Sequence, residues 1–133
     1  MKGYIVQIED AMRDNQHYRR VLFTAKHSQL VLMNLKPGEE IGEEVHGMDQ
    51  FIRFEEGEGT VVLDGEKHAV SDGFAVVIPA GTRHNVVNSG KTAALKLYSL
   101  YSPPEHKDGI IHKTKPEADA DHDHHFDGRT SMK

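Results

Sequence analysis

The apolar residues of the chain fall in short runs that are rich in β-branched and aromatic side chains, and Gly, Pro, Asn or Asp separates most runs from the next. Such runs at hairpin spacing are typical of antiparallel strands joined by tight turns. The pattern therefore predicts an all-β fold, either a barrel or a sandwich. The predicted strands are YRRVLFTA, QLVLMNL, QFIRFEE, GTVVLDG, KHAVSDG, FAVVIPAG, HNVVNSG and ALKLYSLY.

Turn and capping residues indicate how these elements are connected. Asp64-Gly65 separates TVVL from EKHAV, and Ser89-Gly90 separates HNVVN from KTAALKLY. Both are hairpin signals, so we expect the strands on either side of each turn to pair antiparallel. Helices are expected over residues 7–13 and after Thr114, where Thr114 can cap the helix and Glu117 can complete a capping box.

The composition changes after Tyr101. The stretch SPPEHKDG reads as a rigid exit from the barrel, and the chain from Asp119 onward is rich in Asp and His with few apolar residues. A chain of 133 residues, of which 37% are hydrophobic and 28% charged, suits one domain with one core. We therefore predict a barrel over residues 1–102, followed by an arm and an acidic, His-rich tail over residues 103–133.

Composition also limits the partners and the location. No stretch approaches the roughly 20 apolar residues that span a bilayer, and the N-terminal sequence lacks the apolar segment of a signal peptide. We therefore expect a cytoplasmic protein without a membrane partner. A formal charge of −5 and the lack of a basic stripe argue against nucleic acid as a partner. With no cysteine in the chain, any metal must be bound by His, carboxylate or amide groups.

Four polar side chains are candidates for a shared site. In EEVHGMDQF, Glu44 and His46 are two residues apart and so point to the same side of an extended strand. Gln50 begins the return strand, and His84 opens a later predicted strand in GFAVVIPAGTRHNVVN. On the return strand the face that begins with Gln50 becomes apolar farther along. A small barrel with a site near its mouth needs such a face.

These two stretches resemble the two motifs of the cupin family. Residues 37–57 match the first motif and residues 73–88 match the second, which implies a small type 2 cupin. The resemblance implies a double-stranded β-helix barrel of two antiparallel sheets. The matching positions are Gly38, Glu44, His46, Gln50 and Gly57 in the first motif and Gly73, Pro79, Gly81, His84 and Asn88 in the second.

The ligand set that the resemblance implies is unusual. Most cupins have His where this chain has Glu44, and Glu where it has Gln50. The site would then hold one divalent transition metal on Glu44, His46, Gln50 and His84. Two imidazoles and two oxygen donors suit Zn, Mn, Fe or Ni, with Zn slightly favoured. Cupin-class mannose-6-phosphate isomerases have a similar mixture of ligands, and some polyketide cyclases also use a Gln ligand.

Alternatives remain open for these residues. A bulge could make Glu43 the ligand, Gln50 could orient His46 instead of binding metal, and both motif histidines could be plain core residues. The other histidines without motif support are expected on the surface or in turns. These are His17, His27 and His68.

The proton carrier of an enzyme is harder to assign. Tyr98, Lys96 and Arg53 are candidates, but each is also a plausible structural residue, because strand parity decides whether it faces the pocket or solvent. His106 and His112 could belong to a lid over the barrel mouth or to a solvated arm. The tail DHDHHFDG, residues 121–128, could hold a second metal through its Asp and His side chains or be mobile and solvated.

The leading functional hypothesis is a metal-dependent enzyme acting on a small oxygenated molecule. Isomerisation of a sugar, sugar phosphate or keto acid, or a lyase or cyclase step, comes ahead of dioxygenation. The alternative is a non-catalytic module that senses or stores a small ligand or a metal, because fold alone does not separate these classes. The strand YRRVLFTA is expected to be an exposed edge, which predicts a homodimer.

Overall fold

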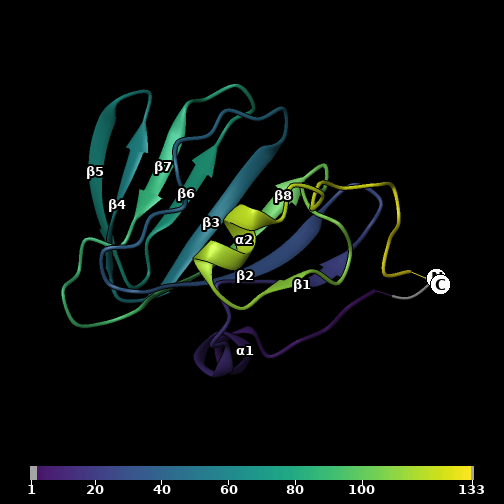
Figure 1. The fold of residues 1–133 in the computed structure, drawn as a ribbon, viewed down its shortest axis with the longest axis horizontal. Helices are drawn as coiled ribbons and strands as arrows, with labels where there is room; N and C mark the ends of the chain where they lie inside the picture. The colour runs from purple at the N-terminus through teal and green to yellow at the C-terminus, as the bar shows by residue number, and fades with distance from the viewer. Residues whose placement is uncertain (1–2, 133) are drawn as a thin grey trace.

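The structure, a computed structural model, describes residues 3–132 as two antiparallel sheets with a short helix near each end of the chain (Figure 1). The expected all-β fold of two antiparallel sheets is confirmed, and each of the eight predicted strands forms. The larger sheet has the strand order β6-β3-β8-β2-β1-β9 and the smaller sheet has the order β5-β4-β7. The elements are α1 (Ile8–Asp14), β1 (Arg19–Thr24), β2 (Gln29–Leu35), β3 (Asp49–Glu56), β4 (Glu58–Leu63), β5 (Glu66–Ser71), β6 (Ala75–Ile78), β7 (His84–Val87), β8 (Leu95–Ser102), β9 (Ile111–His112) and α2 (Lys115–Ala120).

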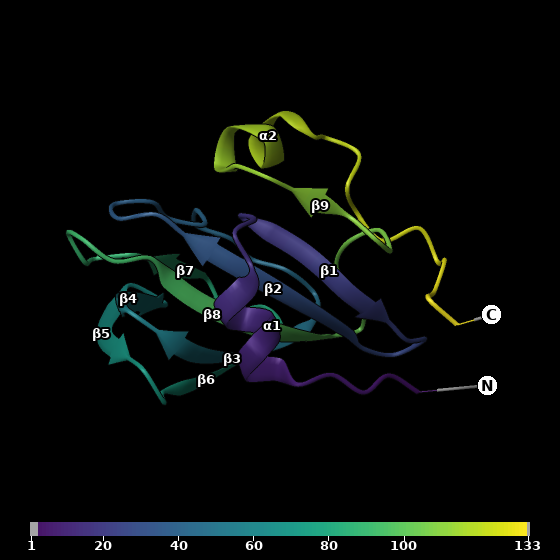
Figure 2. The same ribbon diagram turned by 90° about the horizontal axis from the view of Figure 1, so that it is seen from below.

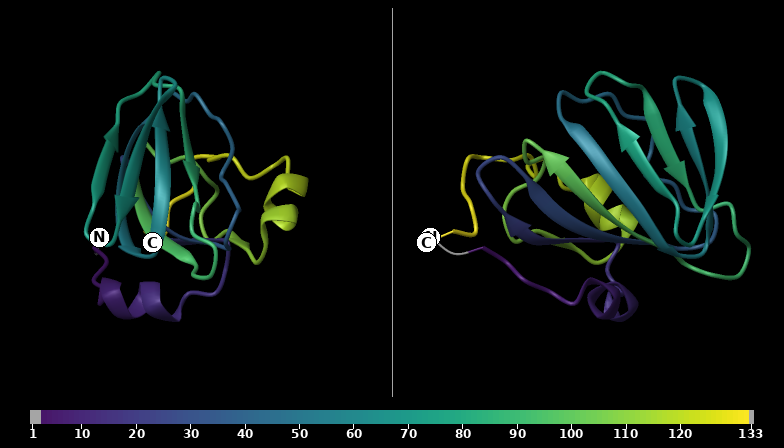
Figure 3. Two further views of the ribbon diagram at one scale, coloured as in Figure 1. Left: turned by 90° about the vertical axis from the view of Figure 1, so that its left-hand side faces the viewer. Right: turned by 180° about the vertical axis from the view of Figure 1, so that it is seen from behind.

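The core lies between the two sheets, which splay apart toward one side of the molecule (Figure 3). On β3, Ile52 and Phe54 point inward and are fully buried, whereas Phe51 faces outward. Val61 of β4 is also fully buried and belongs to the same apolar cluster. Period-two alternation along the strands thus separates the core from the outer face.

One predicted hairpin is confirmed and the other is wrong. Asp64 and Gly65 both have positive φ, 48° and 84°, as a two-residue turn between β4 and β5 requires. Across Ser89-Gly90, however, β7 pairs with β4, while β8 pairs with β2 and β3. The chain therefore crosses from the smaller to the larger sheet at this point.

Asn88 explains the crossing. Its side-chain amide donates to the backbone oxygens of Leu35 and Ala93, at 2.9 and 3.0 Å, and its side-chain oxygen accepts from the backbone N–H of Gly90. These bonds hold the connection against the end of β2 instead of closing a hairpin. A turn signal in the sequence does not reveal such long-range partners.

Gly57 marks another crossing, from β3 to β4. Its φ is +97°, and a Cβ added there would lie 2.4 Å from the backbone oxygen of Ala94. Both the backbone conformation and the close approach of the neighbouring chain require glycine. This motif glycine therefore has a structural role.

The two helices cover opposite faces of the larger sheet (Figures 2 and 3). Helix α1 confirms the helix predicted over residues 7–13 and buries Met12. Helix α2 begins after Thr114, whose hydroxyl accepts from the backbone N–H of Glu117 at 3.3 Å. The carboxylate of Glu117 accepts from the N–H of Lys113, so the capping box is displaced by one residue. No helix within residues 3–132 combines the length and apolar character needed to cross a membrane.

The arm covers the edge of β1, contrary to expectation. Strand β9 pairs with Arg19 and Arg20, and near the other end of β1 the N–H of Ser131 donates to the backbone oxygen of Thr24 at 2.8 Å. YRRVLFTA is therefore not an exposed edge. The homodimer remains a prediction, but it is no longer supported by an exposed edge at β1.

The alternative of a solvated arm is wrong for His106 and His112, which are each 3% exposed. Gln29, buried on β2, anchors the arm. Its amide nitrogen donates to the backbone oxygen of His106 at 2.7 Å, and its oxygen accepts from the N–H groups of Glu105 and His106. The arm is thus tied to the barrel by hydrogen bonds.

Candidate metal centre

His46 and His84 meet at the mouth of the barrel, although the sequence separates them widely. The backbones of Glu44 and His84 form an antiparallel bridge, with N–H to O distances of 2.8 and 2.9 Å. This bridge brings the segment before β3 to the start of β7. The two imidazole rings then lie 4.7 Å apart between centroids, edge to face. The structure therefore brings both motif histidines together.

Backbone carbonyls orient both rings. Nδ1 of His46 lies 3.1 Å from the oxygen of Met48, and Nδ1 of His84 lies 2.9 Å from the oxygen of Thr82. Because a carbonyl oxygen only accepts, each Nδ1 carries the hydrogen, and a neutral ring then keeps a lone pair on Nε2. Metal-binding histidines are commonly held in this way.

Gln50 stands beside His46 and is 3% exposed. Its amide nitrogen donates to the hydroxyl oxygens of Ser99 and Tyr101, at 3.0 and 3.2 Å, and its oxygen lies 3.2 Å from Nε2 of His46. In this arrangement the side-chain oxygen of Gln50 and Nε2 of His46 are both acceptors, so a proton or a metal ion must bridge them. Turning the amide over would let it donate to His46, because both hydroxyls can also donate. The geometry fits Gln50 as a ligand or as the hydrogen-bond partner that orients His46.

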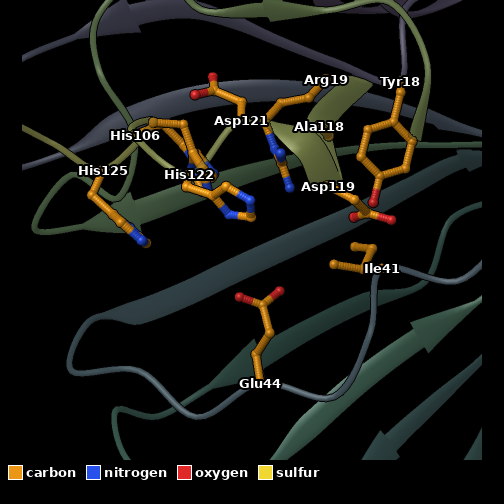
Figure 4. A pocket seen from close by; sticks show the side chains of 11 residues that line it. Tyr18, Arg19, Ile41, Glu44, His106, Ala118, Asp119, Asp121, His122 and His125 are labelled. Atoms are coloured by element: carbon orange, nitrogen blue, oxygen red, sulfur yellow. The ribbon is translucent and has the colours of Figure 1, made fainter. Parts of the chain in front are cut away.

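Glu44 is half-buried, and its carboxylate points into a neighbouring cavity (Figure 4). Glu43 is exposed, so the inward position belongs to Glu44. Within residues 3–132, no three His, Cys, Asp or Glu side chains are grouped closely enough to hold a metal ion by themselves. The predicted four-ligand shell therefore requires Glu44 to turn toward the two histidines and requires the amide oxygen of Gln50 as a donor.

Tyr101 and Glu105 lie near these residues and were not predicted. Burial raises the pKa of the Tyr101 phenol, so it remains protonated at neutral pH. Burial, together with the charge of Glu44, also raises the pKa of Glu105, which is 8% exposed and has one carboxylate oxygen without a partner. Neither residue belongs to a motif. The pairing of β8 with β3 and the hydrogen bond from Gln50 show that Tyr101 faces the site.

The three candidate proton carriers do not reach the site. On β8, Ser99 faces inward, so Tyr98 faces outward, where it is paired with Arg53 of β3. Lys96 also lies on the outer face, and its ammonium group donates to the backbone oxygen of Arg13 at 2.7 Å. Strand parity, which the sequence left open, excludes them from the pocket.

A row of rings connects the mouth to the arm. The centroids of Tyr101 and His106 lie 5.4 Å apart, and those of His106 and His124 lie 5.2 Å apart. His112 contacts Asp121 at 2.9 Å. Across the part of the chain that the structure covers, the tail side chains do not form a metal site. His27 and His68 are exposed and His17 is half-buried, as expected for residues without motif support.

The chain is similar to proteins that share this architecture. Residues 31–101 match the family described as "Cupin domain". YrkC, an uncharacterised protein of Bacillus subtilis, is 46% identical over 129 residues, which cover 92% of this chain and 69% of YrkC. The crystal structure of BH2720 from Bacillus halodurans is 44% identical with a TM-score of 0.87, over 90% of this chain and 96% of that one. KdgF from a Halomonas species is 27% identical with a TM-score of 0.60, over 64% of this chain and 76% of that one. The chain therefore belongs to the cupin family.

Proposed function

We propose that this protein is a metal-dependent enzyme acting on a small oxygenated molecule. The observation that carries the proposal is the arrangement of His46, Gln50 and His84. Both imidazoles are fixed through Nδ1 by backbone carbonyls, and the amide oxygen of Gln50 lies 3.2 Å from a free ring nitrogen. With the carboxylate of Glu44 turned toward the two histidines, the site would have two nitrogen and two oxygen donors. This set would suit one Zn, Mn, Fe or Ni ion, with Zn slightly favoured.

The neighbouring residues support the donors. The carbonyls of Met48 and Thr82 keep Nε2 of each histidine available, and Ser99 and Tyr101 hold the amide of Gln50. When bound, a divalent metal polarises a carbonyl group or lowers the pKa of a bound water. This chemistry suits the isomerisation of a sugar, sugar phosphate or keto acid, or a lyase or cyclase step.

Metal analysis of protein purified without chelator tests the site. We expect about one metal ion per chain in the unaltered protein and loss of that metal in His84→Ala, because the three remaining donors, with only one imidazole among them, bind the ion much more weakly. His27→Ala removes an exposed histidine and serves as the matched control. A double variant, His122→Ala with His125→Ala, tests the tail.

Three results would contradict the site: no metal in the unaltered protein, full metal content in His84→Ala, or loss of metal only in the tail variant. Turnover is tested separately, by incubating the metal-loaded protein with aldoses, sugar phosphates and keto acids and following their conversion by NMR. Ligand binding without conversion would favour the non-catalytic module.

A further inference from the structure

A second feature of the mouth is the cavity that Glu44 enters. It has a volume of about 280 Å³ and lies between the barrel and the C-terminal arm (Figure 4). Tyr18 and Arg19 form one wall and Glu44 stands at another, while histidines and acids of the arm close it. Pockets that bind drug-sized ligands have volumes of roughly 300–1,000 Å³, so this cavity lies at the small end of the range. This cavity therefore suits a small metabolite.

Arg19 is a buried cation that points into this cavity (Figure 4). Its side chain extends from β1, the residue is 7% exposed, and it is the only Lys or Arg among the described residues of the cavity wall. One guanidinium nitrogen, Nη1, contacts Nδ1 of His112 at 3.1 Å, and Nε has no hydrogen-bond partner. Within residues 3–132, no carboxylate forms an ion pair with it. An arginine keeps its charge, and leaving a buried charge unpaired is costly.

The acids of the arm are already paired with other groups. Asp121 contacts His112 at 2.9 Å, and Asp119 contacts the ammonium group of Lys115 at 3.2 Å. Burial holds the pKa of His106 well below its ordinary value, and the nearby charge of Arg19 adds to this shift, so the ring is neutral at pH 7. Among the described residues, no carboxylate of the cavity wall, Glu44 included, lies within ion-pair distance of Arg19.

We propose that this cavity binds a small hydroxy or keto acid, whose carboxylate pairs with Arg19 while an oxygen at its other end reaches Glu44 and the metal centre. The inference rests on the proposed function and narrows its substrate class from small oxygenated molecules to carboxylic acids. The planar guanidinium presents donors in a fork that matches a carboxylate. Glu44 at the far wall would be turned toward the metal when the acid binds.

A carboxylate fits better than a phosphate or an uncharged sugar. A phosphate dianion would bring two negative charges to a wall that offers one arginine and also carries Asp119 and Asp121. An uncharged sugar would leave Arg19 without a counter-ion. A monoanionic carboxylate matches the single charge of Arg19 and brings one negative charge fewer to these acids than a phosphate dianion does.

Titration calorimetry tests the inference on metal-loaded and metal-free protein. The probes are glucuronate, gluconate, 2-oxoglutarate and pyruvate, with glucose and glucose 6-phosphate as neutral and phosphate counterparts of glucuronate. We expect at least one acid to bind, and its Kd to rise by about 30-fold or more in Arg19→Gln, because a buried charge pair loses one partner. Arg20→Gln is the matched control, since Arg20 is the next residue of β1 and is exposed.

Arg19→Lys keeps the charge without the fork, and we expect it to retain part of the affinity. Circular dichroism and metal content show whether each variant remains folded and loaded. Failure of all four acids to bind, equal binding by Arg19→Gln, or tighter binding of glucose 6-phosphate than of any acid would overturn the inference. If the protein holds no metal but acid binding still depends on Arg19, the metal proposal fails and the anion site stands.

Discussion

The inner face of the larger sheet has two regions that differ in what covers them. Under the smaller sheet it is apolar, and Ile52, Phe54 and Leu97 are fully buried. Under the arm it is polar, with Gln29 1% exposed and Arg19 7% exposed. Sheet-on-sheet packing excludes polar groups, whereas the arm satisfies many of them through hydrogen bonds. The first region therefore provides most of the packing stability, and the second provides the buried cation that we assign to ligand binding.

The largest effect is expected in the apolar region. Phe54→Ala leaves a cavity in the core, so we expect the free energy of unfolding to fall by about 3–5 kcal/mol. Phe51→Ala, on the same strand but facing outward, is expected to cost about 1 kcal/mol or less. Urea unfolding followed by circular dichroism measures both. Similar losses of stability for the two variants would contradict the assignment of Phe54 to the core and of Phe51 to the outer face.

A smaller effect, confined to the arm, is expected from Gln29→Ala. The substitution removes the bonds to Glu105 and His106, so we expect a loss of about 1–3 kcal/mol and faster amide exchange at these two residues. The amide of Ile52 is expected to keep its protection. Hydrogen exchange followed by NMR measures both sites, with Gln16→Ala as an exposed control. Unchanged exchange in the arm would show that Gln29 does not anchor it.

The smallest effect concerns pH. The pKa of His106 in the folded protein is well below its ordinary value of 6.5, because burial disfavours the charged ring. Below pH 6.5 the unfolded chain binds a proton that the folded chain does not, so stability falls as the pH falls. The loss is up to about 1.4 kcal/mol per pH unit until the folded pKa is reached. Glu105, whose pKa is raised from 4.5, has the opposite effect, because the folded chain binds its proton first.

His106→Asn isolates the histidine contribution. We expect the variant to lose less stability than the unaltered protein between pH 7 and pH 5, as measured by urea unfolding of the metal-free protein. Glu105 and His124 are present in both proteins, so the difference reports on His106 together with its contact to His124, whose Nδ1 lies 3.0 Å from Nδ1 of His106. If the two proteins lose the same stability between pH 7 and pH 5, His106 is not the source of the pH dependence.

The strand pattern and two motif spacings were sufficient to predict the barrel and to select His46, Gln50 and His84. Alternation of side chains and local turn residues are short-range properties, so Asp64-Gly65 was assigned correctly. Ser89-Gly90 was not, because the bonds of Asn88 to distant backbone groups decide where the chain goes. A local signal cannot distinguish a hairpin from a crossing between sheets.

The polar region under the arm could not be predicted from the amino-acid order. Its Asp- and His-rich composition resembles a solvated tail, and burial arises only when Gln29 and β1 bind the arm from far along the chain. Strand parity and sheet pairing likewise placed Tyr101 at the mouth and Tyr98 outside it. The sequence alone specified the barrel and three residues at its mouth. The tertiary structure decided which charges are buried beside them, because burial and charge pairing depend on contacts between distant segments.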